Sequence, residues 1–154
     1  MKELRRKDRA ITNEEAIAVL IKAEYGVLST VSENGKPYGV PLNFCIIDRC
    51  IYFHCALEGQ KIDHIEKNSS VSFCAVGDTE ILPGQFGTKY ESAIVSGNVE
   101  EVFDDVKQMA LEGLLMKYSP GFIAEGKKYI ETLKGKTRVF KVRIHNLSGK
   151  ARKH

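Results

Sequence analysis

The chain has 154 residues, the length of one domain, and can enclose a hydrophobic core without disulfide or metal cross-links. Hydrophobic residues make up 43% and charged residues 28% of it, proportions that exclude a disordered or low-complexity protein. The net charge of +3 indicates no particular partner, because basic residues concentrate at the two ends, 1–10 and 149–154. The apolar runs fall short of the roughly 18 residues of a membrane span, so we expect a cytoplasmic protein with one domain over residues 1–154.

The first predicted element is a short helix. Thr12 and Glu15 have the spacing of a capping box, in which each residue satisfies a backbone N–H of the other. Ile17, Leu20 and Ile21 then lie on one face of the helix. We expect this face to pack on the core.

Three strands are predicted next. Residues 26–32 and 37–46 are β-rich, and Asn34-Gly35 between them supplies the positive φ of a tight hairpin. A short turn leads to a third strand at residues 51–56. Pro41 lacks the N–H of a central ladder, so we expect the second strand to be irregular or to lie at a sheet edge.

The rest of the chain mixes helices and strands. In chain order the pattern predicts a helix at 58–67, a strand at 71–76, a Gly/Pro-containing connection at 77–87, a strand at 90–102, helices around 106–118 and 122–133, and a strand at 137–147. The six strands, joined mostly by hairpins, predict a mainly β fold: a closed or nearly closed six-stranded antiparallel barrel with peripheral helices. No GxGxxG or GxxxxGK[ST] motif is present, so the usual dinucleotide and triphosphate loops are absent.

The four cysteines lie in apolar, strand-like surroundings. They form no CxxC pair and have no histidine at the spacing of a metal site, so we expect buried free thiols and no bound metal. They are Cys45, Cys50, Cys55 and Cys74.

Eight short segments stand in a characteristic order and spacing: RKDRAI at 6–11, YGVLSTV at 25–31, PYGVPLNF at 37–44, IYFHCA at 51–56, GQK at 59–61, VSF at 71–73, TKYES at 88–92 and SGKAR at 148–152. In these segments the sequence resembles the FMN-binding split-barrel proteins related to pyridoxamine-phosphate oxidase. The resemblance is strongest to the branch that contains nitroimidazole-resistance (Nim-type) proteins, and it covers nearly the whole chain.

The resemblance implies a homodimer with a flavin between its two subunits, FMN being expected and FAD being the alternative. The second strand would meet the ring through backbone groups of Val40, Pro41, Leu42, Asn43 and Phe44. The phosphate would lie near the third strand and the following helix, at His54, Cys55, Ala56 and Lys61. Further candidate contacts are Thr88, Tyr90 and Ser92 on the fifth strand and Lys150 at the basic end.

Each candidate also has a plainer interpretation. Lys61 falls early in a helix, where free N–H groups and a cation can converge on an anion, but exposed helix lysines are common. Thr88, Tyr90 and Ser92 equally suit interface packing, and Lys150 suits a solvated tail. His54 is a structural residue by default, whereas the resemblance places the matching histidine at the active site and makes it our candidate proton donor.

The favoured function is an FMN-dependent oxidoreductase that reduces a small, flat acceptor such as a nitro-aromatic or quinone-like compound. Phe44, Phe86 and Tyr90 are candidate walls of the acceptor pocket, with core packing as the competing explanation for the two phenylalanines. The chain has no Trp and no recognisable substrate-binding His/Arg pair, so vitamin B6 oxidation is disfavoured. The alternative is a non-catalytic flavin- or haem-binding protein, and nucleic-acid binding is disfavoured because no aromatic residues interleave with the terminal basic ones.

Overall fold

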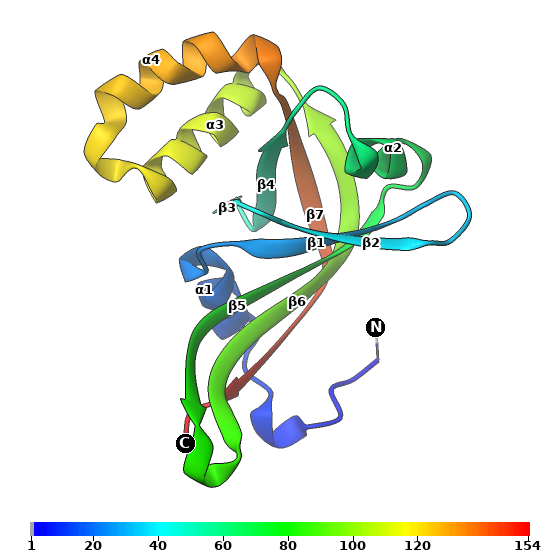
Figure 1. Ribbon diagram of the computed structural model, residues 1–154, viewed down its shortest axis with the longest axis vertical. Coiled ribbons are helices and arrows are strands. Elements are labelled where there is room, and N and C mark those ends of the chain that lie inside the picture. The colour runs from blue at the N-terminus through cyan, green and yellow to red at the C-terminus, as the bar shows by residue number, and fades with distance from the viewer. Residues whose placement is uncertain (1) are drawn as a thin grey trace.

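A seven-stranded antiparallel sheet forms the centre of the computed structural model, which describes residues 2–154 (Figure 1). Met1, the first residue of the predicted basic arm, lies outside the described residues. The strand order is β2-β1-β5-β6-β7-β4-β3. The strands are β1 Gly26–Val31, β2 Pro37–Leu42, β3 Cys45–Ile47, β4 Cys50–Cys55, β5 Ser70–Leu82, β6 Gly87–Val102 and β7 Arg138–Arg152. The α-helices are α1 Asn13–Lys22, α2 Gln60–Lys67, α3 Asp104–Tyr118 and α4 Ile123–Leu133.

The mainly β antiparallel architecture with peripheral helices is confirmed, but the predicted count of six strands and the closure of the barrel are wrong. β2 and β3 stand at the two ends of the strand order, so the sheet is open. The segment predicted as one strand at 37–46 breaks at Asn43 and Phe44. The Tyr118 hydroxyl accepts a hydrogen bond from Phe44 N at 3.0 Å and lies 2.7 Å from the carbonyl oxygen of Glu24. This hydroxyl satisfies backbone groups that an unbroken ladder would otherwise pair.

The connection predicted at 77–87 is also wrong, because most of it is strand. β5 passes a bulge between Val76 and Thr79 and continues to Leu82, and a single 3₁₀ turn at Pro83–Gln85 returns the chain into β6. The resulting β5–β6 arm, residues 76–92, projects away from α2, α3 and α4 (Figure 1), while Lys22 of α1 pairs with Asp78 and Glu91 of the arm. At its tip Phe86 is 95% exposed and has a φ of 52°, a left-handed conformation that is uncommon for a residue with a side chain.

The molecule has two apolar cores on opposite faces of β4. Ile51, Phe53 and Cys55 point into the first core, which α1 and α2 also line. Tyr52 points the other way, into a second core formed with α3 and α4. Because side chains alternate along a strand, His54 faces the same side as Tyr52, beneath the α3–α4 hairpin. Among residues 2–154, no helix combines the length and apolar character needed to cross a membrane.

Candidate functional site

The turn between β4 and α2 brings together several predicted site residues. His54, Cys55 and Ala56 end or follow β4, and Lys61 lies in the first turn of α2. Gly59 precedes this helix without a side-chain cap from the described residues, so the first N–H groups of the helix are left for another partner. Burial lowers the pKa of His54 and raises the pKa of the Cys55 thiol, and the positive charge of Lys61 acts on both groups in the lowering direction. The arrangement offers a cation and backbone donors to an anion.

The surroundings of His54 favour its neutral form, although the residue itself is exposed to water. Crowding of one side of the ring by neighbouring groups lowers its pKa, and the positive charge of Lys61 lowers it further. A neutral imidazole can both donate and accept a hydrogen bond, whereas the protonated ring only donates. The position therefore suits a group that exchanges hydrogen bonds with a ligand at neutral pH.

We expect His54 to titrate below the ordinary value of about 6.5, and Lys61→Met to raise its pKa by removing the nearby cation. NMR titration of the ring Cε1–H signals, assigned with His54→Gln, measures both effects. The pKa of His54 is higher in the unfolded chain than in the folded one. Between these two pKa values the unfolded state binds more protons, so the free energy of unfolding rises with pH there. His54→Gln should flatten the rise; a midpoint above about 6.5 would contradict the prediction.

The predicted ring-binding segment lies along a sheet edge close to α2. Among the described strands β2 pairs with β1 alone, as expected from Pro41, and Val40 and Leu42 turn their side chains toward the first core. The ring of His64 on α2 lies 5.8 Å from that of Tyr38 on β2, centroid to centroid, and its Nδ1 lies 2.9 Å from Thr30 Oγ1. α2 is thus anchored over the β1–β2 hairpin, with Lys61 one turn earlier in the helix.

Four of the other candidates in this region differ in exposure. Asn43 and Ala56 are exposed. Phe44 is completely buried in the first core, where its ring packs edge-on against Phe73 with centroids 4.8 Å apart. Cys55 is buried in the same core. The structure therefore favours core packing for the Phe44 side chain. The four cysteines are free thiols, Cys45 and Cys55 buried and Cys50 and Cys74 half-buried.

The remaining candidates form a second group, on and beside the β5–β6 arm. Tyr90 pairs with Arg152, and Ser92 pairs with Lys150 in the neighbouring strand. The Arg9 guanidinium lies 6.0 Å from the centre of the Tyr90 ring. Thr88, in the same stretch of β6, is half-buried like Tyr90, Ser92 and Lys150.

The two groups are far apart within one protomer. His54 pairs with Val139, which pairs with Val102 at the far end of β6 from Tyr90. At about 3.4 Å per residue, β6 between Val102 and Tyr90 has a contour length of about 40 Å. Phe86 lies further out on the arm. One chain therefore does not place His54, Tyr90 and Phe86 around a common ligand.

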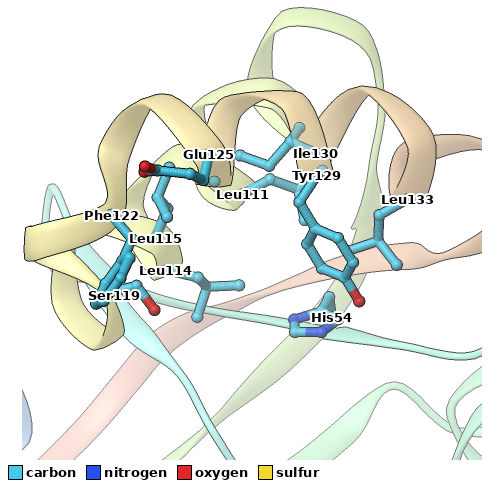
Figure 2. A pocket seen from close by; sticks show the side chains of 11 residues that line it. His54, Leu111, Leu114, Leu115, Ser119, Phe122, Glu125, Tyr129, Ile130 and Leu133 are labelled. Atoms are coloured by element: carbon cyan, nitrogen blue, oxygen red, sulfur yellow. The ribbon is translucent and has the colours of Figure 1, made fainter.

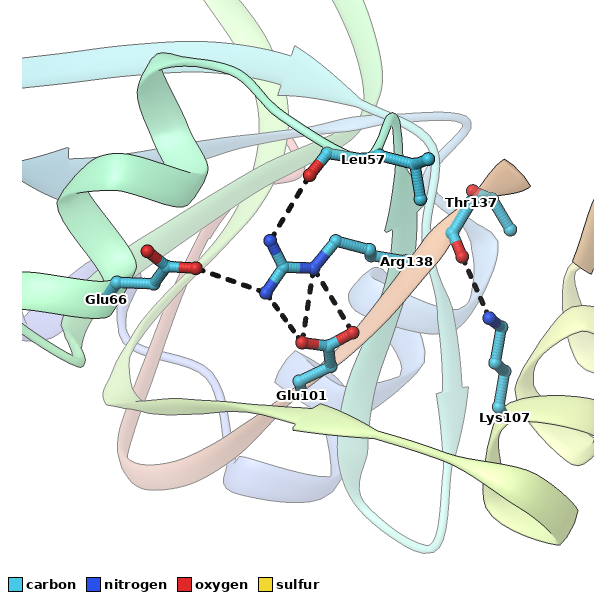
Figure 3. A network of polar contacts seen from close by, with 6 residues as sticks. All are labelled: Leu57, Glu66, Glu101, Lys107, Thr137 and Arg138. Carbon is cyan, nitrogen blue, oxygen red and sulfur yellow. Dashed lines mark hydrogen bonds and ion pairs between the residues drawn. The ribbon is translucent and has the colours of Figure 1, made fainter. Parts of the chain in front are cut away.

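Two neighbouring residues at the start of β7, Thr137 just before the strand and Arg138 as its first residue, position the β4–α2 turn, and the sequence analysis missed both (Figure 3). Thr137 donates a buried hydrogen bond from its hydroxyl to the Cys55 carbonyl at 2.7 Å. Arg138 pairs with Glu101, with Nη2 and Oε1 2.7 Å apart, and its guanidinium also reaches Glu66 on α2 and the Leu57 carbonyl, each at 3.3 Å. In the sequence, an arginine in an alternating strand looks like an ordinary surface residue, so only the fold shows this role.

Arg138→Met is expected to lower the free energy of unfolding by roughly 2 kcal/mol, because it leaves the half-buried Glu101 carboxylate without its partner. Urea denaturation measures the change. Arg143→Met is the control, since Arg143 forms a more exposed pair with Glu100 and should cost less than about 1 kcal/mol. Equal losses in the two variants would contradict the positioning role of Arg138.

A cavity of about 370 Å³ lies beneath the α3–α4 hairpin, with His54 at one end (Figure 2). Apolar side chains of α3 and α4 form most of its wall. Gly126 permits the close helix crossing above it, because a Cβ there would collide with the Leu115 side chain. The complete lining is His54, Leu111, Leu114, Leu115, Ser119, Phe122, Glu125, Gly126, Tyr129, Ile130 and Leu133.

The family model described as pyridoxamine 5'-phosphate oxidase matches residues 12–151, which is nearly the whole chain. The chain belongs to this family. The predicted family resemblance is thereby confirmed. No curated protein sequence matches the chain.

Several solved structures share the fold of this family member. A proposed 5-nitroimidazole antibiotic resistance protein from Bacteroides thetaiotaomicron superposes with a TM-score of 0.73 at 22% identity, over 92% of this chain and 85% of that one. A FAD-binding protein from Mesorhizobium loti has a TM-score of 0.65 at 24% identity, over 94% and 97%. A FAD and haem binding protein from Mycobacterium smegmatis has a TM-score of 0.71 at 19% identity, over 93% and 72%. At these identities the likeness establishes the fold alone.

Proposed function

We propose that this family member is an FMN-dependent oxidoreductase that reduces a small, flat acceptor such as a nitro-aromatic or quinone-like compound. The observation that carries the proposal is the β4–α2 turn, where Lys61 and the uncapped start of α2 follow the end of β4 that bears His54, a residue whose pKa is lowered by its surroundings. Helix N-termini with a neighbouring cation suit phosphate groups. The nitroimidazole-resistance protein among the structural neighbours supports the choice of acceptor.

The residues present fit a flavin mononucleotide in chemical terms. Lys61 and the first N–H groups of α2 would hold the phosphate, and the free edge of β2 around Pro41 would meet the polar edge of the ring. When bound, the flavin supplies the hydride or electrons of the reduction. His54 would donate a proton or a hydrogen bond to the acceptor, and the side chains near it would exclude water.

We infer further that the working unit is a homodimer with each flavin shared between protomers. The separation of His54 from Tyr90 and Ser92 supports this inference, because a twofold axis can bring the arm of one protomer to the β4–α2 turn of the other. The sites predicted from the sequence then form one site drawn from two chains. Phe86 at the exposed arm tip would lie against the partner.

The purified protein should be yellow, and the cofactor released by denaturation should co-elute with FMN rather than FAD in chromatography. Turnover of reduced nicotinamide with nitro-aromatic and quinone acceptors then tests the reductase activity. A colourless protein that also fails to bind added FMN would overturn the proposal. Release of FAD instead of FMN would show that the proposed cofactor is wrong, and the proposed flavin site would be retained.

A second candidate function is a flavin or haem carrier without turnover. A neutral histidine facing an apolar cavity is the environment of a haem ligand, and the Mycobacterium smegmatis neighbour binds both FAD and haem. Addition of haemin distinguishes this candidate: a sharp Soret band that His54→Ala abolishes, together with no acceptor reduction, would favour it over the reductase.

A further inference from the structure

The cavity beneath the α3–α4 hairpin has polar groups at two ends of an apolar middle. Figure 2 shows His54 and the Tyr129 hydroxyl near each other at one end, with Ser119 and Glu125 toward the other. Leu114 lies between the two ends (Figure 2). Small-molecule sites are typically apolar hollows of about 300–1,000 Å³ with a few placed polar groups. At about 370 Å³, the cavity has the size of a site for one compact ring system.

The charge of the lining restricts what can enter. Within residues 2–154 no lysine or arginine lines the cavity, and Glu125 is its one formally charged residue. A phosphate or carboxylate on a ligand would lose hydration there and find no cation in return. An uncharged or positively charged ligand meets no such cost.

Two aromatic rings at the cavity remain open to water. Phe122 is 65% exposed and Tyr129 is 64% exposed, although both line the cavity. Flat faces of this kind gain contact area when an aromatic ligand stacks against them or meets them edge-on. The lining therefore favours a planar ligand over a flexible aliphatic one.

We propose that this cavity binds a small, planar, mainly apolar molecule that is uncharged or cationic, with a hydrogen-bonding group at the His54–Tyr129 end and any positive charge toward Glu125. Its role as the acceptor site rests on the proposed reductase function. His54 lies near the end of the strand that leads to the proposed flavin site and also lines the cavity, so an acceptor bound in the cavity would lie next to it. The binding itself does not depend on that function. The same lining disfavours acceptors that carry phosphate or carboxylate groups.

Three ligands of matched shape test the proposal by isothermal titration calorimetry at pH 7 and low salt: 4-nitrobenzylamine, 4-nitrobenzyl alcohol and 4-nitrobenzoate. The cationic amine should bind about three- to fivefold more tightly than the alcohol, as a partly exposed ion pair allows. The anionic benzoate should bind at least about threefold more weakly than the alcohol. Equal affinity for the amine and the benzoate would overturn the proposal.

Variants of α4 locate the binding. Glu125→Gln should abolish the preference for the amine over the alcohol, while Glu131→Gln, outside the lining, should retain it. Leu133→Trp should fill the cavity mouth and weaken all three ligands by about tenfold, because apolar contacts are lost. Ala124→Trp adds the same side chain at an exposed position outside the lining and should change nothing. Unchanged binding in Leu133→Trp would show that the ligands bind elsewhere.

The flavin absorbance of the same preparations separates the two proposals. Ligand binding that follows the predicted order in a protein unable to hold flavin would overturn the reductase and leave the cavity site intact. A flavin-loaded protein whose ligands ignore Glu125 and Leu133 would overturn the cavity site and leave the flavin site intact.

Discussion

Lys61→Met is expected to weaken FMN binding by about ten- to a hundredfold. A hydrogen bond between a charged donor and an anion contributes about 1.5–3 kcal/mol, and methionine keeps the length of the lysine stem while removing its charge. Quenching of FMN fluorescence on titration with protein freed of its cofactor measures the affinity. Lys61→Arg keeps the positive charge and should lose much less affinity for FMN than Lys61→Met does.

Lys67→Met at the other end of α2 is the matched control. Lys67 is an exposed lysine of the same helix, at the end where the helix dipole is negative, so its loss should leave FMN affinity unchanged. Riboflavin, which has no phosphate, should bind Lys61→Met and the wild type equally. Equal FMN affinity in the wild type and Lys61→Met would place the phosphate elsewhere.

A mixed dimer is expected to regain flavin that neither parent variant holds. One parent is Lys61→Met, and the other is the double variant Ser92→Ala, Lys150→Met, two residues that face each other across β6 and β7. If each site takes its turn from one protomer and its arm from the other, the mixed dimer has one intact site and one doubly altered site. It should hold about half of the wild-type flavin per protomer.

Two different affinity tags on the co-expressed copies allow the mixed dimer to be isolated by sequential purification. Flavin content is then read from the visible spectrum against protein concentration. Each parent homodimer should be nearly colourless. A colourless mixed dimer would contradict the shared site, because two sites that are each contained within one protomer would both remain defective.

Local signals in the sequence were sufficient for the short-range features of the fold. Glu15 N donates to Thr12 Oγ1 at 3.1 Å and the Glu15 carboxylate accepts from Thr12 N at 3.3 Å, which confirms the predicted capping box. Gly35 has the positive φ of 80° expected for the hairpin. Such features depend on residues a few positions apart, so the pattern that forms them is visible in the chain itself.

Features that depend on distant partners could not be predicted in the same way. The break at Phe44 is stabilised by Tyr118, seventy-four residues later. The β5–β6 arm was mistaken for a loop for two reasons. Gly77 and Pro83 are residues typical of turns, and the exposed strands of the arm have no buried face that would impose an alternating apolar pattern. The hairpin cavity was missed since Leu111 and Leu114 fit the periodicity of a core face equally well.

The position of β7 has a consequence for how the protein is made. Within residues 2–154, β4 pairs with two strands, the three-residue β3 and the late-synthesised β7, and the start of β7 and the residue before it supply Arg138 and Thr137. During synthesis the turn bearing His54 and Lys61 must therefore wait for residues 137–143 before it is fixed, and such long-range pairing is slow. Ribosome-bound chains stopped before residue 138 should bind no flavin, and cofactor loading becomes a late event that completes folding.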